Sequence, residues 1–151
     1  MMTCLGRCVL FVTIDESLAR LGFDYILSVF EAYNNALIAG DYDAVFATMV
    51  DDVKWHQPGK NPLSGIKEGK AALGAHLGKF MEKSNGTFKV LTNWVSANGN
   101  LVAANATFVA DRGGDDKLDM NGVDLFRIEG GKIQEVWLFS ADQDGEDAYW
   151  A

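Results

Sequence analysis

The second half of the sequence holds four segments with strand character, joined by short glycine-containing turns. Residues 87–97 and 101–110 flank Asn98 and Gly99, a pair typical of two-residue β-hairpins. Residues 117–128 and 132–140 follow after turns at residues 112–115 and 129–131. The sequence therefore predicts a run of four antiparallel strands, which must bury one face of its sheet.

Helical patterns precede these strands. Apolar residues recur on one face of residues 23–39, at Ile26, Val29, Phe30, Tyr33 and Leu37. Asp41 is expected to cap a second, short helix with an inner face of Val45, Phe46 and Met49, ended by residues 51–52. Residues 53–57 then read as a strand and residues 60–69 as a loop. A third stripe comprises Leu73, Leu77, Phe80 and Met81.

This order predicts an α+β fold, with three N-terminal helices packed on a curved, mostly antiparallel sheet. The length of 151 residues suits one domain, which we place at residues 23–151. Residues 1–22 are expected to be an N-terminal extension of unknown order. The acidic tail at residues 142–151 carries Tyr149 and Trp150, which should pack back on the body.

Charge and composition exclude several classes of function. The net charge of −8 would repel nucleic acid, and no segment has the ~20 apolar residues of a membrane helix. Cys4 and Cys8 are expected to be free thiols in a cytoplasmic protein. The two histidines, His56 and His76, are far apart in sequence without acidic partners at metal-ligand spacing. We therefore expect neither a metal nor a cofactor.

Asp124 is the most informative residue for function. Strand alternation places it on the same face as Leu118, Met120, Phe126 and Ile128, with Gly122 as a bare position among them. A carboxyl group on an apolar face must find a partner, keep its proton, or line a cavity. The pattern leaves a structural and a functional Asp124 equally open.

Three other polar residues are candidates for the same interior. Tyr33 lies on the inner stripe of the first helix, from where its hydroxyl can reach inward. Gln57 alternates with Val53 and Trp55 on the inner face of the first strand. Alternation directs His56 outward, unless the break at residues 58–59 turns the strand end and re-aims it as a proton carrier. His76, at the margin of the third helical stripe, is expected to be a structural or a surface residue.

Longer stretches of the chain resemble a known superfamily. Residues 33–43 (YNNALIAGDYD), 51–55 (DDVKW) and 57–58 (QP) resemble the opening of nuclear-transport-factor-2-like proteins. Residues 123–128 (VDLFRI) and 131–137 (GKIQEVW) resemble their closing strands, in the SnoaL-like and ketosteroid-isomerase-like branch. The resemblance covers about residues 23–151 and implies a cone around an apolar cavity. It fixes the reaction poorly, because this fold hosts isomerases, cyclases, lyases and adaptors.

The resemblance also implies roles for particular residues. Tyr33 matches an oxyanion-hole tyrosine of ketosteroid isomerases, and Asp124 matches their protonated aspartate and the acid/base of SnoaL-like cyclases. Gln57 stands where the isomerase base is an aspartate, and an amide cannot accept a proton. The expected catalytic residues are Asp124, Tyr33 and His56, and the expected substrate-binding residues are Gln57, Trp55, Met49, Met120, Phe126 and Trp137.

Three functions remain open on this basis. The first is a cofactor-independent isomerase, cyclase or lyase that moves protons on a small hydrophobic molecule. The second is a binding protein for such a molecule, which the amide at Gln57 favours. The third is a dimerisation or adaptor module. The family implies a homodimer in all three cases.

Overall fold

The computed structural model describes the backbone of residues 8–151 and the side chains of residue 18 and residues 20–151. The helices found there are α1 (Cys8–Ala39), α2 (Tyr42–Ala47), α3 (Lys70–Lys83) and α4 (Gln143–Trp150). The strands are β1 (Met49–Gln57), β2 (Gly65–Glu68), β3 (Lys89–Asn98), β4 (Leu101–Asp111), β5 (Lys117–Glu129) and β6 (Lys132–Ser140).

The strands form one sheet in the order β2-β1-β6-β5-β4-β3. The predicted antiparallel run is confirmed, because β3 to β6 each pair with the next strand along the chain. The β3–β4 hairpin turns through Gly99, whose φ of 59° suits the left-handed conformation that a two-residue turn requires. β1 pairs in parallel with β6 and antiparallel with β2, so the sheet is mixed at this edge. The predicted α+β class is confirmed.

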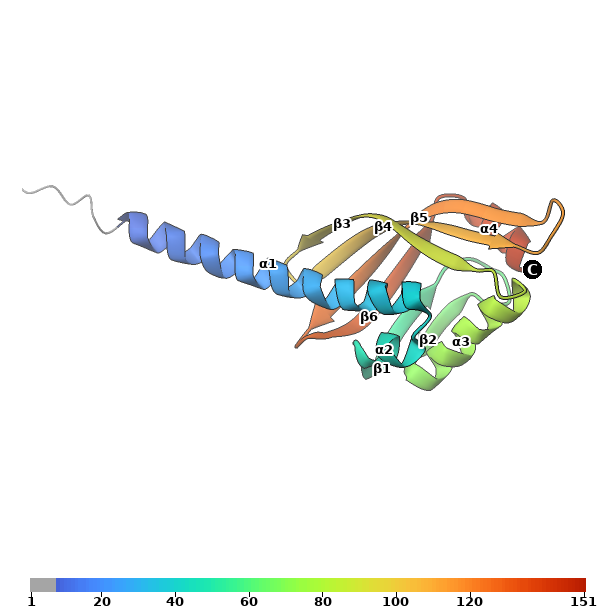
Figure 1. The fold of residues 1–151 in the computed structure, drawn as a ribbon, viewed down its shortest axis with the longest axis horizontal. Coiled ribbons are helices and arrows are strands. Elements are labelled where there is room, and N and C mark those ends of the chain that lie inside the picture. Colours follow the sequence, from blue (N-terminus) through green and yellow to red (C-terminus); the bar gives the residue numbers. More distant parts are fainter. Residues whose placement is uncertain (1–7) are drawn as a thin grey trace, which may run out of the picture.

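The helices enclose the concave face of the sheet. α1 packs against α2, β3 and β4, and α3 packs against β1 and β2 (Figure 1). Figure 1 also shows α1 continuing beyond the edge of the sheet. One cluster of buried side chains joins α1 to the middle strands, centred on Phe30, Tyr33 and Phe126. A second joins α3 and α4 to β4 and β5, centred on Phe80, Leu118 and Trp150.

The structure differs from the sequence expectations in four elements. α1 begins at Cys8, so it starts well before the predicted stripe at residue 23. Met49 begins β1 and is not part of α2, and residues 51–52 lie within that strand. The cause is pairing with β6, since Met49 lies opposite Ile133 and the Ile133 amide donates to the Thr48 carbonyl. The predicted loop at residues 60–69 contains β2, and the tail forms α4.

The expected helix cap at Asp41 and the expected packing of the C-terminal tail are both confirmed. Asp41 caps α2, because its side chain accepts a hydrogen bond from the Ala44 amide at 3.0 Å. Tyr149 and Trp150 are buried, so the tail packs back on the body as predicted. The side chains of Cys4 and Cys8 lie outside the described part of the chain.

None of the helices within residues 8–151 combines the length and hydropathy that crossing a bilayer requires.

Candidate functional site

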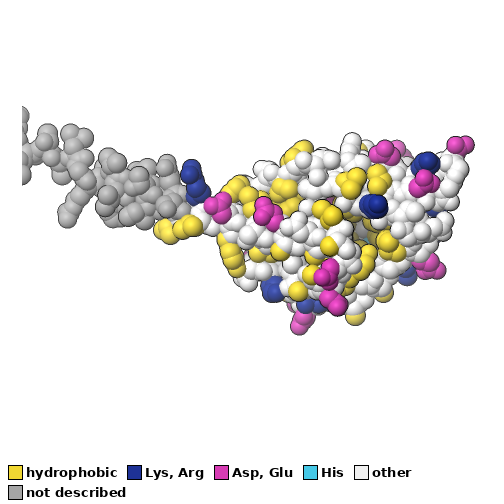
Figure 2. Space-filling view, viewed as in Figure 1, with side chains coloured by type: hydrophobic (Ala, Val, Ile, Leu, Met, Phe, Trp, Pro, Cys, Tyr) yellow, Lys and Arg dark blue, Asp and Glu magenta, His cyan; other side chains and the backbone are white. Residues whose placement is uncertain are grey.

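A cavity of about 350 Å³ opens between the two buried clusters. Its walls are mainly apolar and come from α1, α2, α3, α4 and the concave face of the sheet. Hydrophobic side chains gather around the hollow on the face seen in Figure 2. This volume lies within the range of pockets that hold small organic molecules. The acidic and basic side chains along its wall, within the described residues, are Lys89, Asp124 and Glu146.

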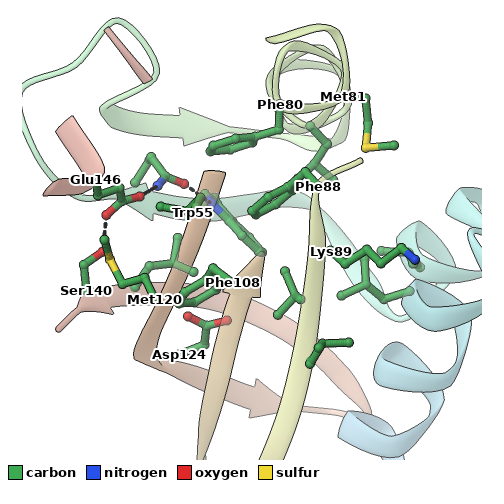
Figure 3. A pocket seen from close by; sticks show the side chains of 18 of the residues that line it. Trp55, Phe80, Met81, Phe88, Lys89, Phe108, Met120, Asp124, Ser140 and Glu146 are labelled. Carbon is green, nitrogen blue, oxygen red and sulfur yellow. Dashed lines mark hydrogen bonds between the residues drawn. The ribbon is translucent and has the colours of Figure 1, made fainter. Parts of the chain in front are cut away.

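Asp124 projects from β5 into this cavity (Figure 3). Its strand alternates as the sequence predicts, with Leu118, Asp124 and Phe126 on the buried face. Asp124 is 4% exposed, and its Oδ1 atom has no hydrogen-bond partner among the residues described. Burial raises the pKa of the Asp124 carboxyl to about 8, and the charge of Glu146 adds to this rise. At neutral pH the site therefore holds a protonated carboxyl group.

Tyr33 faces the same cavity from α1. Its ring packs on Phe30 and Phe126, with centroid distances of 6.0 and 5.2 Å. Burial raises the pKa of the Tyr33 hydroxyl above its ordinary value, and the charge of Asp124 contributes to this rise. The hydroxyl is therefore a proton-bearing donor within electrostatic range of Asp124.

Gln57 is the last residue of β1 and also lines the cavity. Its Oε1 atom is 3.4 Å from Nε1 of Trp55 and 3.2 Å from Nε2 of His76. Burial, together with Lys67 and Lys79, lowers the pKa of His76 to about 4, so this imidazole is neutral. Of the two positions left open by the sequence, structural or surface, His76 takes the first, as a buried partner of Gln57.

Glu146 is the functional candidate that the sequence reasoning missed. It enters the cavity from α4, is 8% exposed, and accepts hydrogen bonds from Gln57 and Ser140 (Figure 3). Burial raises the pKa of the Glu146 carboxyl, while hydrogen bonds from Ser140, Gln143 and Gln57 oppose the rise. Helical spacing could have identified it, because Glu146 shares a face with Tyr149 and Trp150.

His56 does not line the cavity: it points outward as strand alternation predicts, and the strand end does not turn it inward as a catalytic residue would require. Its Nε2 atom is 2.7 Å from Oε1 of Glu135, and its ring stacks on Trp137 with centroids 5.3 Å apart. Trp137, expected to bind substrate, lies with His56 on the outer face of the sheet. Alternation explains both positions, since Trp55 and Gln57 on β1 and Val136 and Leu138 on β6 point the other way.

Phe126 is also absent from the cavity wall. It is 1% exposed and lies beneath Tyr33 and Phe30, so it supports the site and does not contact its interior. Trp55, Met49 and Met120 do line the cavity, as does Gln57. The structure thus brings six of the nine sequence-predicted site residues to the same cavity and places His56, Trp137 and Phe126 elsewhere.

The described residues contain no group of three or more His, Cys, Asp or Glu side chains arranged to hold a metal ion. The expected absence of a cofactor stays a prediction.

The fold and cavity define the class of the protein. A curved sheet with helices closing its concave face around an apolar pocket is the cone of the nuclear-transport-factor-2-like superfamily. Residues 30–136 match the model of the SnoaL-like domain. The chain belongs to the SnoaL-like family.

Solved structures agree with this assignment. A Xanthomonas campestris protein of unknown function with a cystatin-like fold is 42% identical, with a TM-score of 0.77 over 83% of this chain and 98% of that one. A Jannaschia protein proposed to be a SnoaL-like polyketide cyclase is 17% identical, with a TM-score of 0.70 over 86% and 94%. TerC, co-crystallised with polyporic acid, is 17% identical, with a TM-score of 0.73 over 84% and 99%. No functionally curated protein matches.

Proposed function

We propose that this protein is an enzyme that transfers protons on a small hydrophobic substrate held in the cavity, in an isomerase, cyclase or lyase reaction. The observation that carries this proposal is Asp124, a carboxyl group in an apolar cavity whose Oδ1 atom finds no partner in the described part of the chain. A buried carboxyl that keeps its proton at neutral pH can donate it to an oxygen on which charge develops. No metal or redox group is needed for such a step.

The wall supplies further groups to hold the substrate. Tyr33, which lines the same cavity from α1, would donate a second hydrogen bond to this oxygen. Trp55, Met49 and Met120 would contact the apolar body of the substrate, and Gln57 would orient polar groups beside it.

Two relatives support this reading. The Jannaschia protein is proposed to be a polyketide cyclase, and TerC was crystallised with an organic acid, polyporic acid. Both are similar to this chain in fold, so they support a small organic ligand, and the reaction has to be determined by experiment.

A binding protein without catalysis is the alternative, and the amide at Gln57 favours it because an amide cannot act as a base. A dimerisation or adaptor module is a third possibility. Its support is the outer sheet face, where the exposed side chains of Trp94 and Phe139 lie in one cross-strand row with Asn105 and Val123. A homodimer through this face and a cytoplasmic location stay predictions.

Replacement of Asp124 by Asn tests the proposal. A panel of aromatic ketones and polyketide-like compounds is first screened for turnover by mass spectrometry. Asp124→Asn should then lower turnover of the best substrate by about 10²- to 10⁴-fold, the range for loss of an acid/base group. Asp119→Asn is the control, since Asp119 is exposed on the same strand.

Three outcomes separate the possibilities. Loss of turnover in Asp124→Asn with an unchanged Asp119→Asn supports the enzyme. Equal turnover in both variants would eliminate the role of Asp124. A ligand that binds tightly and is recovered chemically intact would support the binding protein.

A further inference from the structure

The second carboxyl group of the cavity, Glu146, is held by three side-chain donors. Gln57 Nε2 donates to its Oε1 at 3.2 Å, and Gln143 Nε2 donates to its Oε2 at 3.2 Å. The Ser140 hydroxyl also donates to Oε2. A carboxylate that accepts several hydrogen bonds is stabilised in its charged form. At Glu146 these three donors oppose the rise in pKa that burial causes, and so favour the carboxylate.

The orientation of Gln57 is fixed by its other neighbours. Trp55 Nε1 is a donor only, so it must donate to the Gln57 carbonyl oxygen. His76 Nε2 lies 3.2 Å from the same oxygen, which accepts only, so the neutral His76 carries its proton on Nε2. With its oxygen engaged twice, Gln57 must present its NH₂ group to Glu146. Trp55 and His76 thus position the amide that holds the carboxylate.

Asp124 has the opposite environment. No side chain within the described residues donates to its carboxyl group, and burial favours its protonated form. Burial raises the pKa of both carboxyl groups, but hydrogen-bond donors oppose the rise only at Glu146. Of the two, Asp124 is therefore the better acid to keep its proton and Glu146 the better base.

The two groups are also spaced to act on one molecule. Ser140, which donates to Glu146, lies opposite Gly122 in the β5–β6 pair, and Asp124 is two residues further along β5. Two residues of a strand span roughly 7 Å. The Phe108 ring packs against Gly122 in this interval, and both carboxyl groups line the same cavity (Figure 3).

We propose that Glu146 is the base of this site and that it removes a proton from a carbon beside the carbonyl group of the substrate, while Asp124 donates to the carbonyl oxygen. This inference rests on the proposed function and names its substrate class as hydrophobic carbonyl compounds with an acidic C–H bond. The C–H bond breaks, its proton moves to Glu146, and its electron pair forms the C=C bond of an enol. The enol oxygen takes the proton of Asp124. Return of a proton from Glu146 to carbon, and from the enol oxygen to Asp124, restores both groups.

Hydrogen exchange into a ketone tests this step without knowledge of the natural substrate. 2-Tetralone, a bicyclic aromatic ketone, is incubated with the protein in D₂O, and loss of its α-proton signals is followed by NMR. The wild-type protein should exchange these protons faster than buffer alone. Glu146→Gln should lower the enzymatic rate by about 10²-fold or more. Asp144→Asn, an exposed acid on the same helix, is the matched control and should keep the wild-type rate.

Two further variants guard against a folding artefact. Glu146→Asp keeps a carboxylate on a shorter side chain and should recover part of the rate that Glu146→Gln loses. Gln57→Leu removes one donor to Glu146, so the rising limb of the pH–rate profile should move to higher pH. Quenching of tryptophan fluorescence by 2-tetralone reports whether each variant still binds the probe.

The outcomes distinguish this inference from the proposed function. Loss of exchange in both Asp124→Asn and Glu146→Gln, with probe binding retained, supports both. Loss in Asp124→Asn with wild-type exchange in Glu146→Gln overturns the role of Glu146 alone. A wild-type protein that binds 2-tetralone and exchanges it no faster than buffer overturns both.

Discussion

The guanidinium group of Arg112 lies 3.9 Å from the centre of the Tyr149 ring and so fixes the C-terminal helix to the β4–β5 turn. Its Nη2 atom donates to the Tyr149 carbonyl at 2.6 Å, and its Nε atom donates to the Lys83 carbonyl at the end of α3 at 2.7 Å. A single side chain therefore ties together the two helices that close one end of the cavity.

Arg112→Met should lower the free energy of unfolding by about 2–3 kcal/mol, because it removes two charged hydrogen bonds and a cation–π contact. Urea denaturation followed by tryptophan fluorescence measures the change. Arg127→Met is the control, with an expected loss below about 1 kcal/mol, since Arg127 is paired at the outer face of the sheet. Equal losses in the two variants would contradict the role of Arg112.

Asp124 should make the stability of the protein depend on pH. The native carboxyl keeps its proton up to about pH 8, whereas the unfolded chain releases it near pH 4. The native state then binds more protons between these values, so the free energy of unfolding falls as pH rises through this window. The amide introduced by Asp124→Asn cannot ionise, so the free energy of unfolding of this variant should lack the part of the fall that is due to Asp124.

Urea denaturation at pH 5, 7 and 9 measures this effect. The free energy of unfolding of the wild type minus that of Asp124→Asn should fall by more than about 1 kcal/mol from pH 5 to pH 9. The difference between the wild type and Asp119→Asn should stay constant. A constant difference for Asp124→Asn as well would mean that native Asp124 is ionised at pH 5.

Gly122 should not tolerate a side chain. A Cβ atom at this position would overlap the Phe108 ring and the Phe139 carbonyl oxygen. Gly122→Ala should therefore cost about 1–3 kcal/mol of unfolding free energy, the range for overpacking a buried site. Gly78→Ala is the matched control, because open space surrounds this exposed position in α3 and alanine should add about 0.5–1 kcal/mol there. Stabilisation by both substitutions would contradict the close packing at Gly122.

His56→Ala should leave turnover in the cavity unchanged. His56 contacts Glu135 and Trp137 on the outer face of the sheet, so it cannot exchange a proton with a molecule inside. The loss of unfolding free energy should stay below about 1 kcal/mol, as is usual for partly exposed ion pairs. Turnover is measured beside Asp124→Asn, and a comparable loss in His56→Ala would contradict its placement outside.

The sequence predicted the parts of this protein that depend on local patterns. Glycine-containing turns and strand alternation placed β3 to β6 and put Asp124 on the buried face, because both signals act within a few residues. Met49 was assigned to the wrong element, since a short apolar pattern fits a helix end and a strand start equally well and pairing with Ile133 decides between them. β2 was missed because its four residues have no alternation of burial.

Within the site, the sequence indicated single residues and could not show their partners. The contact of Gln57 with Glu146 joins residues 89 positions apart, and no local pattern encodes such a distance. Because the tail was read only as an acidic segment with two aromatic residues, its helical face was overlooked. The outward direction of His56 followed from alternation, and the expected turn at residues 58–59 did not reverse it.

Glu146 and Trp150 belong to the last segment of the sequence, yet they form part of the cavity wall. During synthesis on the ribosome the sheet leaves the exit tunnel before these residues do. We therefore expect the cavity of a nascent chain to be completed only once α4 has emerged, so that the chain cannot enclose a hydrophobic molecule before that point.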